Sequence, residues 1–131
     1  TLETVPDGVS LMERLYKTGR PPDVLYLDLN MPKKGGLDCL MEIKYHPALS
    51  KIPVIVFTTS FQAETVDLLF AQGAQYYIQK PAEFDALRNI IYKSLLMVFK
   101  GSLMQPERNQ FVLEANLDEA ILSRQQGNIS I

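Results

Sequence analysis

The amino-acid sequence predicts an α/β fold in which a parallel β-sheet carries helices on both faces. Three short runs are apolar at nearly every position, as in strands buried on both sides, namely residues 24–27, 52–57 and 76–78. The longer segments between them repeat apolar residues every three or four positions, as one side of a helix does. Strands that alternate with helices in this order build a parallel sheet from βαβ units.

The composition indicates one globular domain and excludes several classes of protein. The chain has 131 residues, of which 47% are hydrophobic, and a formal net charge of -2, whereas a nucleic-acid-binding face needs a basic surplus. No apolar run is long enough for a membrane span, so we expect a soluble cytoplasmic protein that binds neither nucleic acid nor membrane. The single cysteine, Cys39, rules out a disulfide within the chain. The single histidine, His46, argues against a histidine-rich metal site or a Ser-His-Asp triad.

Four segments have the apolar periodicity of helices, and each predicts a stripe that faces the core. The residues on these stripes are Val9, Met12, Leu15 and Tyr16 in the first, Leu37, Leu40, Met41 and Lys44 in the second, Val66, Leu69 and Phe70 in the third, and Phe84, Leu87, Ile90, Ile91 and Leu95 in the last. Asp7 is placed to cap the first helix, and Gly73 ends the third. We interpret Cys39 as a packing residue, because a buried thiol usually behaves as a small hydrophobe.

Three polar residues stand where the predicted strands end: Asp28, Thr58 and Lys80. Right-handed crossovers bring the carboxyl ends of parallel strands to one edge of the sheet, where ligands bind in such folds. A carboxylate can attack phosphorus, while an ammonium group and a hydroxyl can stabilise the charge on the transferred oxygens. The alternative is structural: Asp28 starts a turn, Thr58 ends a strand, and Lys80 pairs with Asp28 to hold two loops together.

With these residues the chain resembles a response-regulator receiver domain, the phosphoacceptor module of two-component signalling. The resemblance rests on the sequence from Asp28 to Pro32 with Gly36 after it, on the run from Pro53 to Thr58, and on Lys80-Pro81. It extends over residues 1–100 and implies a flavodoxin-like doubly wound parallel sheet with the strand order 2-1-3-4-5.

The resemblance also implies roles for single residues. Asp28 would accept a phosphoryl group from the phosphohistidine of a histidine kinase or phosphotransfer protein, and signalling would follow through protein contacts. Mg²⁺ would be bound by Asp28 and the backbone carbonyl of Asn30. Thr58 and Tyr77 would form the conformational switch, and the peptide bond between Lys80 and Pro81 would be cis.

Three further residues would tune the lifetime of the phosphoryl group. By the same resemblance Asn30 and Ser60 lie above the phosphoryl group, two residues beyond Asp28 and Thr58. Thr59 is bulkier than the small residue that is often found at its position, and it should narrow the approach of water. The expected module is a signalling domain rather than an enzyme.

One departure from the family concerns its first strand and helix, which have no counterpart in this sequence. Receivers carry an acidic pair at the end of that strand, so metal binding by this chain should be weak or absent. The missing strand would lie beside residues 24–27. We expect the gap to be filled by another segment of the protein, by a second copy or by residues 111–113. Otherwise the strand expected at Leu2 to Val5 should not form.

Three alternatives remain beside a phosphorylated receiver. A receiver-like docking module would keep the fold without being phosphorylated, as the missing acidic pair favours. A haloacid-dehalogenase-type phosphatase would need a second acid at Asn30, which cannot titrate. A flavodoxin-type cofactor binder would need a hydroxyl- and glycine-rich phosphate loop, which follows none of the strands.

Residues 101–131 are predicted to form a C-terminal extension. It consists of a linker around Pro106 and a short helix over residues 116–126. The sequence contains no DNA-binding output domain after the receiver-like part. Residues 95–99 are apolar on every side of the predicted helix, which indicates a contact with a protein partner, a second copy or the extension itself.

Overall fold

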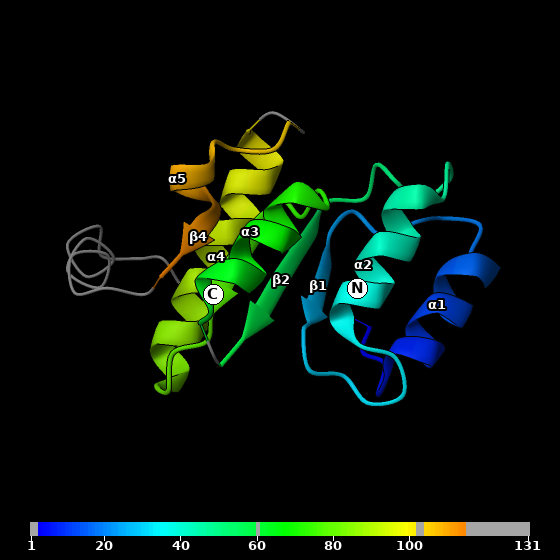
Figure 1. Ribbon diagram of the computed structural model, residues 1–131, viewed down its shortest axis with the longest axis horizontal. Coiled ribbons are helices and arrows are strands. Elements are labelled where there is room, and N and C mark those ends of the chain that lie inside the picture. Colours follow the sequence, from blue (N-terminus) through cyan, green and yellow to red (C-terminus); the bar gives the residue numbers. More distant parts are fainter. Residues whose placement is uncertain (1–2, 60, 102–103, 115–131) are drawn as a thin grey trace.

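The computed structural model describes residues 3–59, 61–101 and 104–114, and it shows the predicted alternation of strands and helices (Figure 1). The elements are α1 (Gly8–Lys17), β1 (Leu25–Asp28), α2 (Gly36–Tyr45), β2 (Val54–Thr58), α3 (Ala63–Ala71), β3 (Tyr76–Gln79), α4 (Phe84–Lys100), α5 (Arg108–Phe111) and β4 (Val112–Leu113).

The four strands form one parallel sheet in the order β1-β2-β3-β4. Residues of α1, α2 and α3 pack with Leu27, Val54 and Val56 on one face of the sheet. On the other face α4 packs against Ile55 and Ile78. The prediction of a parallel sheet with helices on both faces is confirmed, and the carboxyl ends of β1, β2 and β3 lie at one edge of it.

The buried stripes of three helices differ in part from the prediction. In α2 the buried side chains are Cys39, Leu40 and Ile43, whereas Leu37, Met41 and Lys44 are only partly buried. In α1 the core contains Leu11, Met12 and Leu15, whereas Val9 and Tyr16 are exposed. The hydroxyl of Tyr16 donates a hydrogen bond to Glu42 on α2. In α4 the buried stripe is Ile90, Ser94 and Val98, and the exposed fraction of Phe84 is 71%. Phe84 stands six residues before Ile90, which at 3.6 residues per turn places it about 120° away from that stripe.

The two ends of the described chain differ from a simple receiver sheet. Residues 3–5 form no strand, and within the described part of the chain β1 pairs with β2 alone. Residues 111–113 do not fill the gap beside β1. Val112 instead pairs with Tyr77 at the opposite edge, where Phe111 is fully buried against the α3 face and Leu113 joins the α4 cluster.

No helix in the described part of the chain is long and apolar enough to cross a membrane. The helix predicted over residues 116–126 lies outside the described residues. Between α4 and β4 the chain forms the short helix α5, so the stretch after Pro106 is more ordered than the expected linker.

Candidate functional site

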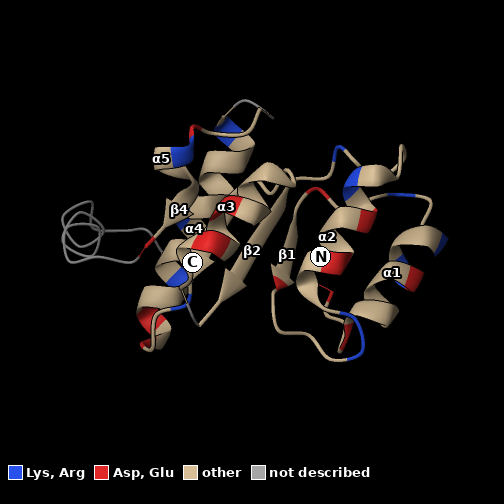
Figure 2. Cartoon of the chain, viewed as in Figure 1, with Lys and Arg blue, Asp and Glu red and all other residues tan. Residues whose placement is uncertain are grey.

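The ends of three adjacent strands bring Asp28, Thr58 and Lys80 to one edge of the sheet, as the sequence predicts. The acidic end of β1 is visible in Figure 2. The ends of β2 and β3 are joined directly, because the backbone N–H of Lys80 donates a hydrogen bond of 2.7 Å to the carbonyl of Thr58. The Lys80 ammonium group thereby reaches Asp28 across β2, with 3.2 Å between Nζ and Oδ2.

Each oxygen of the Asp28 carboxylate has a donor. Oδ1 accepts a hydrogen bond of 2.9 Å from the backbone N–H of Asn30, and Oδ2 accepts one from Lys80. The side chains of Asp28 and Lys80 are 37% and 25% exposed, so the pair lies at the surface and can be reached from solvent. A carboxylate that is oriented by two donors and still open to solvent can act as a nucleophile.

Asn30 connects the carboxylate to the buried hydroxyl. Its Nδ2 donates a hydrogen bond of 3.2 Å to Oγ1 of Thr58, which is only 1% exposed. Asp28, Asn30 and Thr58 are therefore held in one network, while Thr59 is exposed beside it. Ser60, the third of the predicted tuning residues, lies outside the described residues.

The loop after β1 depends on a glycine at the start of α2. The N–H of Gly36 donates to the carbonyl of Leu29, and a Cβ atom at Gly36 would stand 2.6 Å from the carbonyl oxygen of Asp28. Only glycine allows the backbone of α2 to approach the end of β1 this closely. Because Gly36 fixes this approach, it contributes directly to the position of Asp28.

The same loop carries two lysines that are bound to the neighbouring helices. Lys33 adopts a left-handed conformation with φ of 65°, and its ammonium group lies 3.6 Å from Asp7. Lys34 pairs with Glu42 on α2. The backbone N–H of Ser10 donates to the Asp7 carboxylate and, despite opposing desolvation, lowers its pKa below the ordinary value, with Lys33 adding to the effect. Figure 2 shows this basic loop beside the first turns of α1 and α2.

One residue of the site, Phe57, was assigned from the sequence only to the strand. The Lys80 ammonium group stands 4.3 Å from the centroid of the Phe57 ring, a cation–π contact, and Phe57 in turn meets the ring of Tyr26 edge to face. The signal available in the sequence was only the position of Phe57 directly before Thr58, at the end of an apolar run.

The predicted cis bond between Lys80 and Pro81 is wrong. Every peptide bond among the described residues is trans. For a bond that precedes proline the trans form is favoured by about 0.5–1 kcal/mol, and the hydrogen bond from Lys80 to Thr58 is made with that form.

The described residues do not fit a complete magnesium site. They contain no group of three or more acidic, histidine or cysteine side chains that could hold a metal ion. The available oxygens are the Asp28 carboxylate and the carbonyl of Asn30, and Oδ2 of Asp28 already accepts from Lys80. Mg²⁺ prefers six oxygen ligands, so these two groups alone would hold it weakly.

Tyr77, the predicted switch residue, points into the protein. Its exposed fraction is 1%, and burial raises the pKa of its hydroxyl. Its ring contacts those of Phe61, at a centroid distance of 6.1 Å, and Phe111, at 6.4 Å.

The fold is a parallel α/β sheet with helices on both faces and an aspartate at the end of one strand. Residues 1–92 match the family model of the response regulator receiver domain, and the chain belongs to this family. Receiver domains are signalling modules of two-component systems that interact with histidine kinases and phosphotransfer proteins, and as a family they bind Mg²⁺.

Among known proteins, the chain is similar to response regulator Rcp1 of Synechocystis sp., with 38% identity over 79 residues that cover 56% of this chain and 54% of Rcp1. The structure of the phosphorylated cyanobacterial phytochrome response regulator RcpA superposes with a TM-score of 0.70 at 34% identity, covering 74% of this chain and 73% of that one. The Mn²⁺-bound form of Rcp1 gives a TM-score of 0.65 at 30% identity, covering 78% and 76%. The chain spans about half the length of the curated relatives it matches.

Proposed function

We propose that Asp28 is the phosphoacceptor of this receiver domain and takes its phosphoryl group from a phosphohistidine. The observation that carries the proposal is the Asp28 carboxylate itself, oriented by Asn30 and Lys80 yet open to solvent at the carboxyl edge of the sheet. An oxygen of Asp28 attacks phosphorus, the bond between phosphorus and the donor imidazole breaks, and the imidazole keeps the electron pair. The product is an acyl phosphate on Asp28.

Lys80 and Thr58 would stabilise the phosphorylated form of Asp28. The phosphoryl group adds negative charge next to Lys80, and an ammonium group within hydrogen-bond reach stabilises such charge. The hydroxyl of Thr58, which accepts a hydrogen bond from Asn30, would turn to a phosphoryl oxygen. Asn30, Thr59 and Ser60 then govern how water reaches the acyl phosphate, and Tyr77 reports the change to partners.

Mg²⁺ would be bound weakly by the residues that the structure describes, through Asp28 and the carbonyl of Asn30. It would supply further neutralisation of the phosphoryl oxygens. The same shortage of acidic ligands favours the second candidate function, a docking module of receiver fold that is not phosphorylated.

Labelling with acetyl phosphate separates the two candidates. Intact-mass measurement of the chain in rising Mg²⁺ should show one added phosphoryl group that hydroxylamine removes, as expected for an acyl phosphate. Asp28→Asn should not be labelled. Asp23→Asn, which alters an exposed aspartate before β1, should be labelled like the wild type.

Equal labelling of wild type and Asp28→Asn would refute the assignment of the phosphoacceptor. Complete absence of labelling in the wild type, at Mg²⁺ concentrations that saturate other receivers, would favour the docking module instead.

A further inference from the structure

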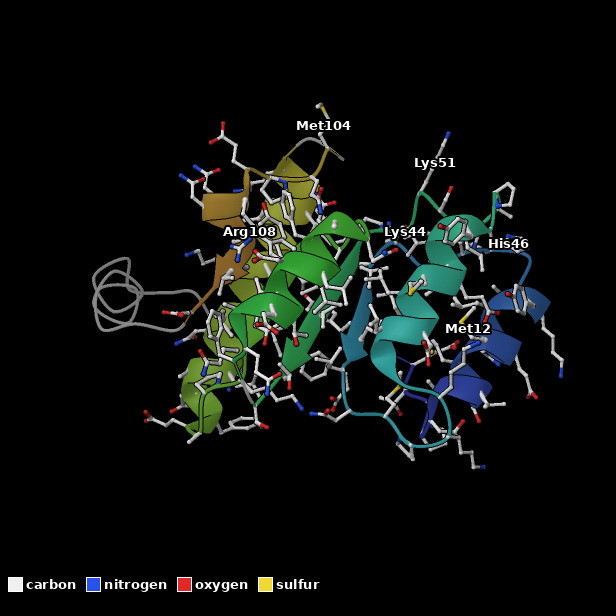
Figure 3. The ribbon with its side chains drawn as sticks, in the orientation of Figure 1. Met12, Lys44, His46, Lys51, Met104 and Arg108 are labelled. Atoms are coloured by element: carbon white, nitrogen blue, oxygen red, sulfur yellow. The ribbon has the colours of Figure 1, made fainter. Side chains whose placement is uncertain are left out.

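A hollow of about 490 Å³ lies at the amino end of the sheet, opposite the end that carries Asp28. It is bordered by α2, by the loops that lead into β2 and β3, and by the residues after α4. Three of the side chains around it, Lys44, Lys51 and Met104, can be followed in Figure 3. Its volume is in the range of pockets that hold small molecules.

The charge of this hollow is not balanced by the protein. Its lining contains Lys44 and Lys51 but no acidic side chain. Among the ion pairs of the described residues, neither lysine takes part. Lys44 is partly buried, and the desolvation lowers the pKa of its ammonium group. An anion in the hollow would offset this cost.

The ammonium group of Lys44 is held in place with one hydrogen left for a ligand. It donates to the carbonyls of Ser50 and Ile52, at 3.1 Å each. Its aliphatic stem lies beside Gly73, where a Cβ atom would meet carbons of Lys44 at 3.6 Å. An ammonium group has three hydrogens, so the third can be donated into the hollow. A structural role in this turn explains the two carbonyl contacts but not the second lysine.

The other residues of the hollow can bind both ends of an anionic molecule. Lys51 is exposed on the turn after α2, so its side chain can reach an anion held by Lys44. Gln75 is 8% exposed and donates one amide hydrogen to the carbonyl of Met104 at 2.9 Å. The side chain of Met104 is 78% exposed, and together with Pro53 it offers apolar surface.

We propose that this hollow binds a small phosphate monoester, with the phosphate between Lys44 and Lys51 and the organic part against Pro53 and Met104. A phosphate monoester carries about −1.5 to −2 charges at pH 7, which two ammonium groups match better than they match a single carboxylate. Lysine commonly binds phosphate as a point charge. The site is independent of the proposed function, because it lies at the other end of the strands and needs no phosphorylation of Asp28.

NMR titration of the chain with inorganic phosphate and with phenyl phosphate, at constant ionic strength, tests the site. The amides of residues 50–52 and 73–75 should shift and reach saturation, whereas those of α1 should stay in place. Phenyl phosphate should bind roughly three- to tenfold more tightly than inorganic phosphate, because its ring covers apolar surface in the hollow. Met104→Ser should reduce this difference between the two compounds.

Three lysine variants separate the site from a general effect of charge. Lys44→Gln should weaken the binding of phenyl phosphate roughly tenfold, as expected for a lost hydrogen bond from a charged donor. Lys51→Gln, at an exposed residue, should weaken it about two- to fivefold. Lys17→Gln is the matched control, because it removes an exposed lysine of α1, and it should bind like the wild type.

Several outcomes would overturn the proposal. Shifts confined to residues 28–30 and 79–80 would assign phosphate to the other end of the strands. Equal weakening by Lys17→Gln and Lys44→Gln would show that only the net charge matters. Equal affinities for the two compounds would exclude a site for the organic part. If circular dichroism shows that Lys44→Gln does not fold, the wild-type shifts and Lys51→Gln decide the question.

Discussion

The two lateral sides of the sheet, at β1 and at β3 with β4, are built differently. At one edge, β1 carries the phosphoacceptor candidate and, in the part of the chain described, has β2 as its single neighbour. At the other, β3 carries Tyr77 and is covered by β4 and by the buried Phe111. Asp28 therefore ends a strand that α1 and α2 cover on one face, whereas Tyr77 lies on a strand that pairs with β4 and contacts Phe111.

The largest effect is expected in the core under β1. Leu27 is 1% exposed and packs with α1 and α2, so Leu27→Ala should lower the free energy of unfolding by about 2–5 kcal/mol. Urea denaturation followed by circular dichroism measures this loss. A loss below that of Leu113→Ala would show that the β1 edge is the less well-packed of the two.

The next effect concerns the approach of α2 to β1. Gly36→Ala places a methyl group against the Asp28 carbonyl and should cost about 1–3 kcal/mol. Gly19→Ala is the matched control, because a Cβ atom there meets nothing within 4 Å. Equal urea midpoints for the two variants would contradict the requirement for glycine at the site.

At the opposite side of the sheet a deletion should cost less, because β4 contains only two residues. Leu113 is buried, with 6% of its surface exposed, yet Leu113→Ala should cost only on the order of 1 kcal/mol, because so short a terminal strand can open locally while the rest stays folded. Calorimetry measures this value, and a loss as large as that of Leu27→Ala would make β4 an integral part of the core.

A smaller effect is expected at Phe57, which contacts Lys80 beside Asp28. Phe57→Leu removes the cation–π contact with Lys80, worth about 1 kcal/mol, and should slow labelling of Asp28 by acetyl phosphate roughly fivefold. Phe57→Tyr keeps the ring and should label at the wild-type rate. The idea fails if the leucine and tyrosine variants label equally fast.

The smallest effect is a pH dependence at Asp7, the cap of α1. Its pKa is lowered in the folded protein, so its contribution to stability is complete above the ordinary value of 3.8 and is lost as the pH falls through the folded pKa below it. Asp7→Asn should therefore lie below the wild type in stability at neutral pH and converge with it in acid. Denaturation curves at several pH values check this, and a constant difference would contradict it.

The site was predictable because its residues obey a simple rule of parallel sheets. Asp28, Thr58 and Lys80 end apolar runs, and the crossovers place strand ends together whatever their separation along the chain. The readout side was harder to predict. β4 contains two residues, too few for any periodicity, and Phe111 is anchored by residues far away in the sequence. The error at Phe84 has a similar origin, because a helix stripe is set by its packing partners and an apolar residue near its first turn can face solvent.

The position of Phe111 has a consequence for how the protein is made. A ribosome releases the chain from the amino end, so α1 to α4 emerge before residues 111–113 and can pack around Leu27, Val56 and Ile78 first. Until then the edge of β3 lacks its pairing with residues 112–113. A nascent chain at this stage exposes an apolar strand edge, the kind of surface that chaperones and other unfinished chains bind.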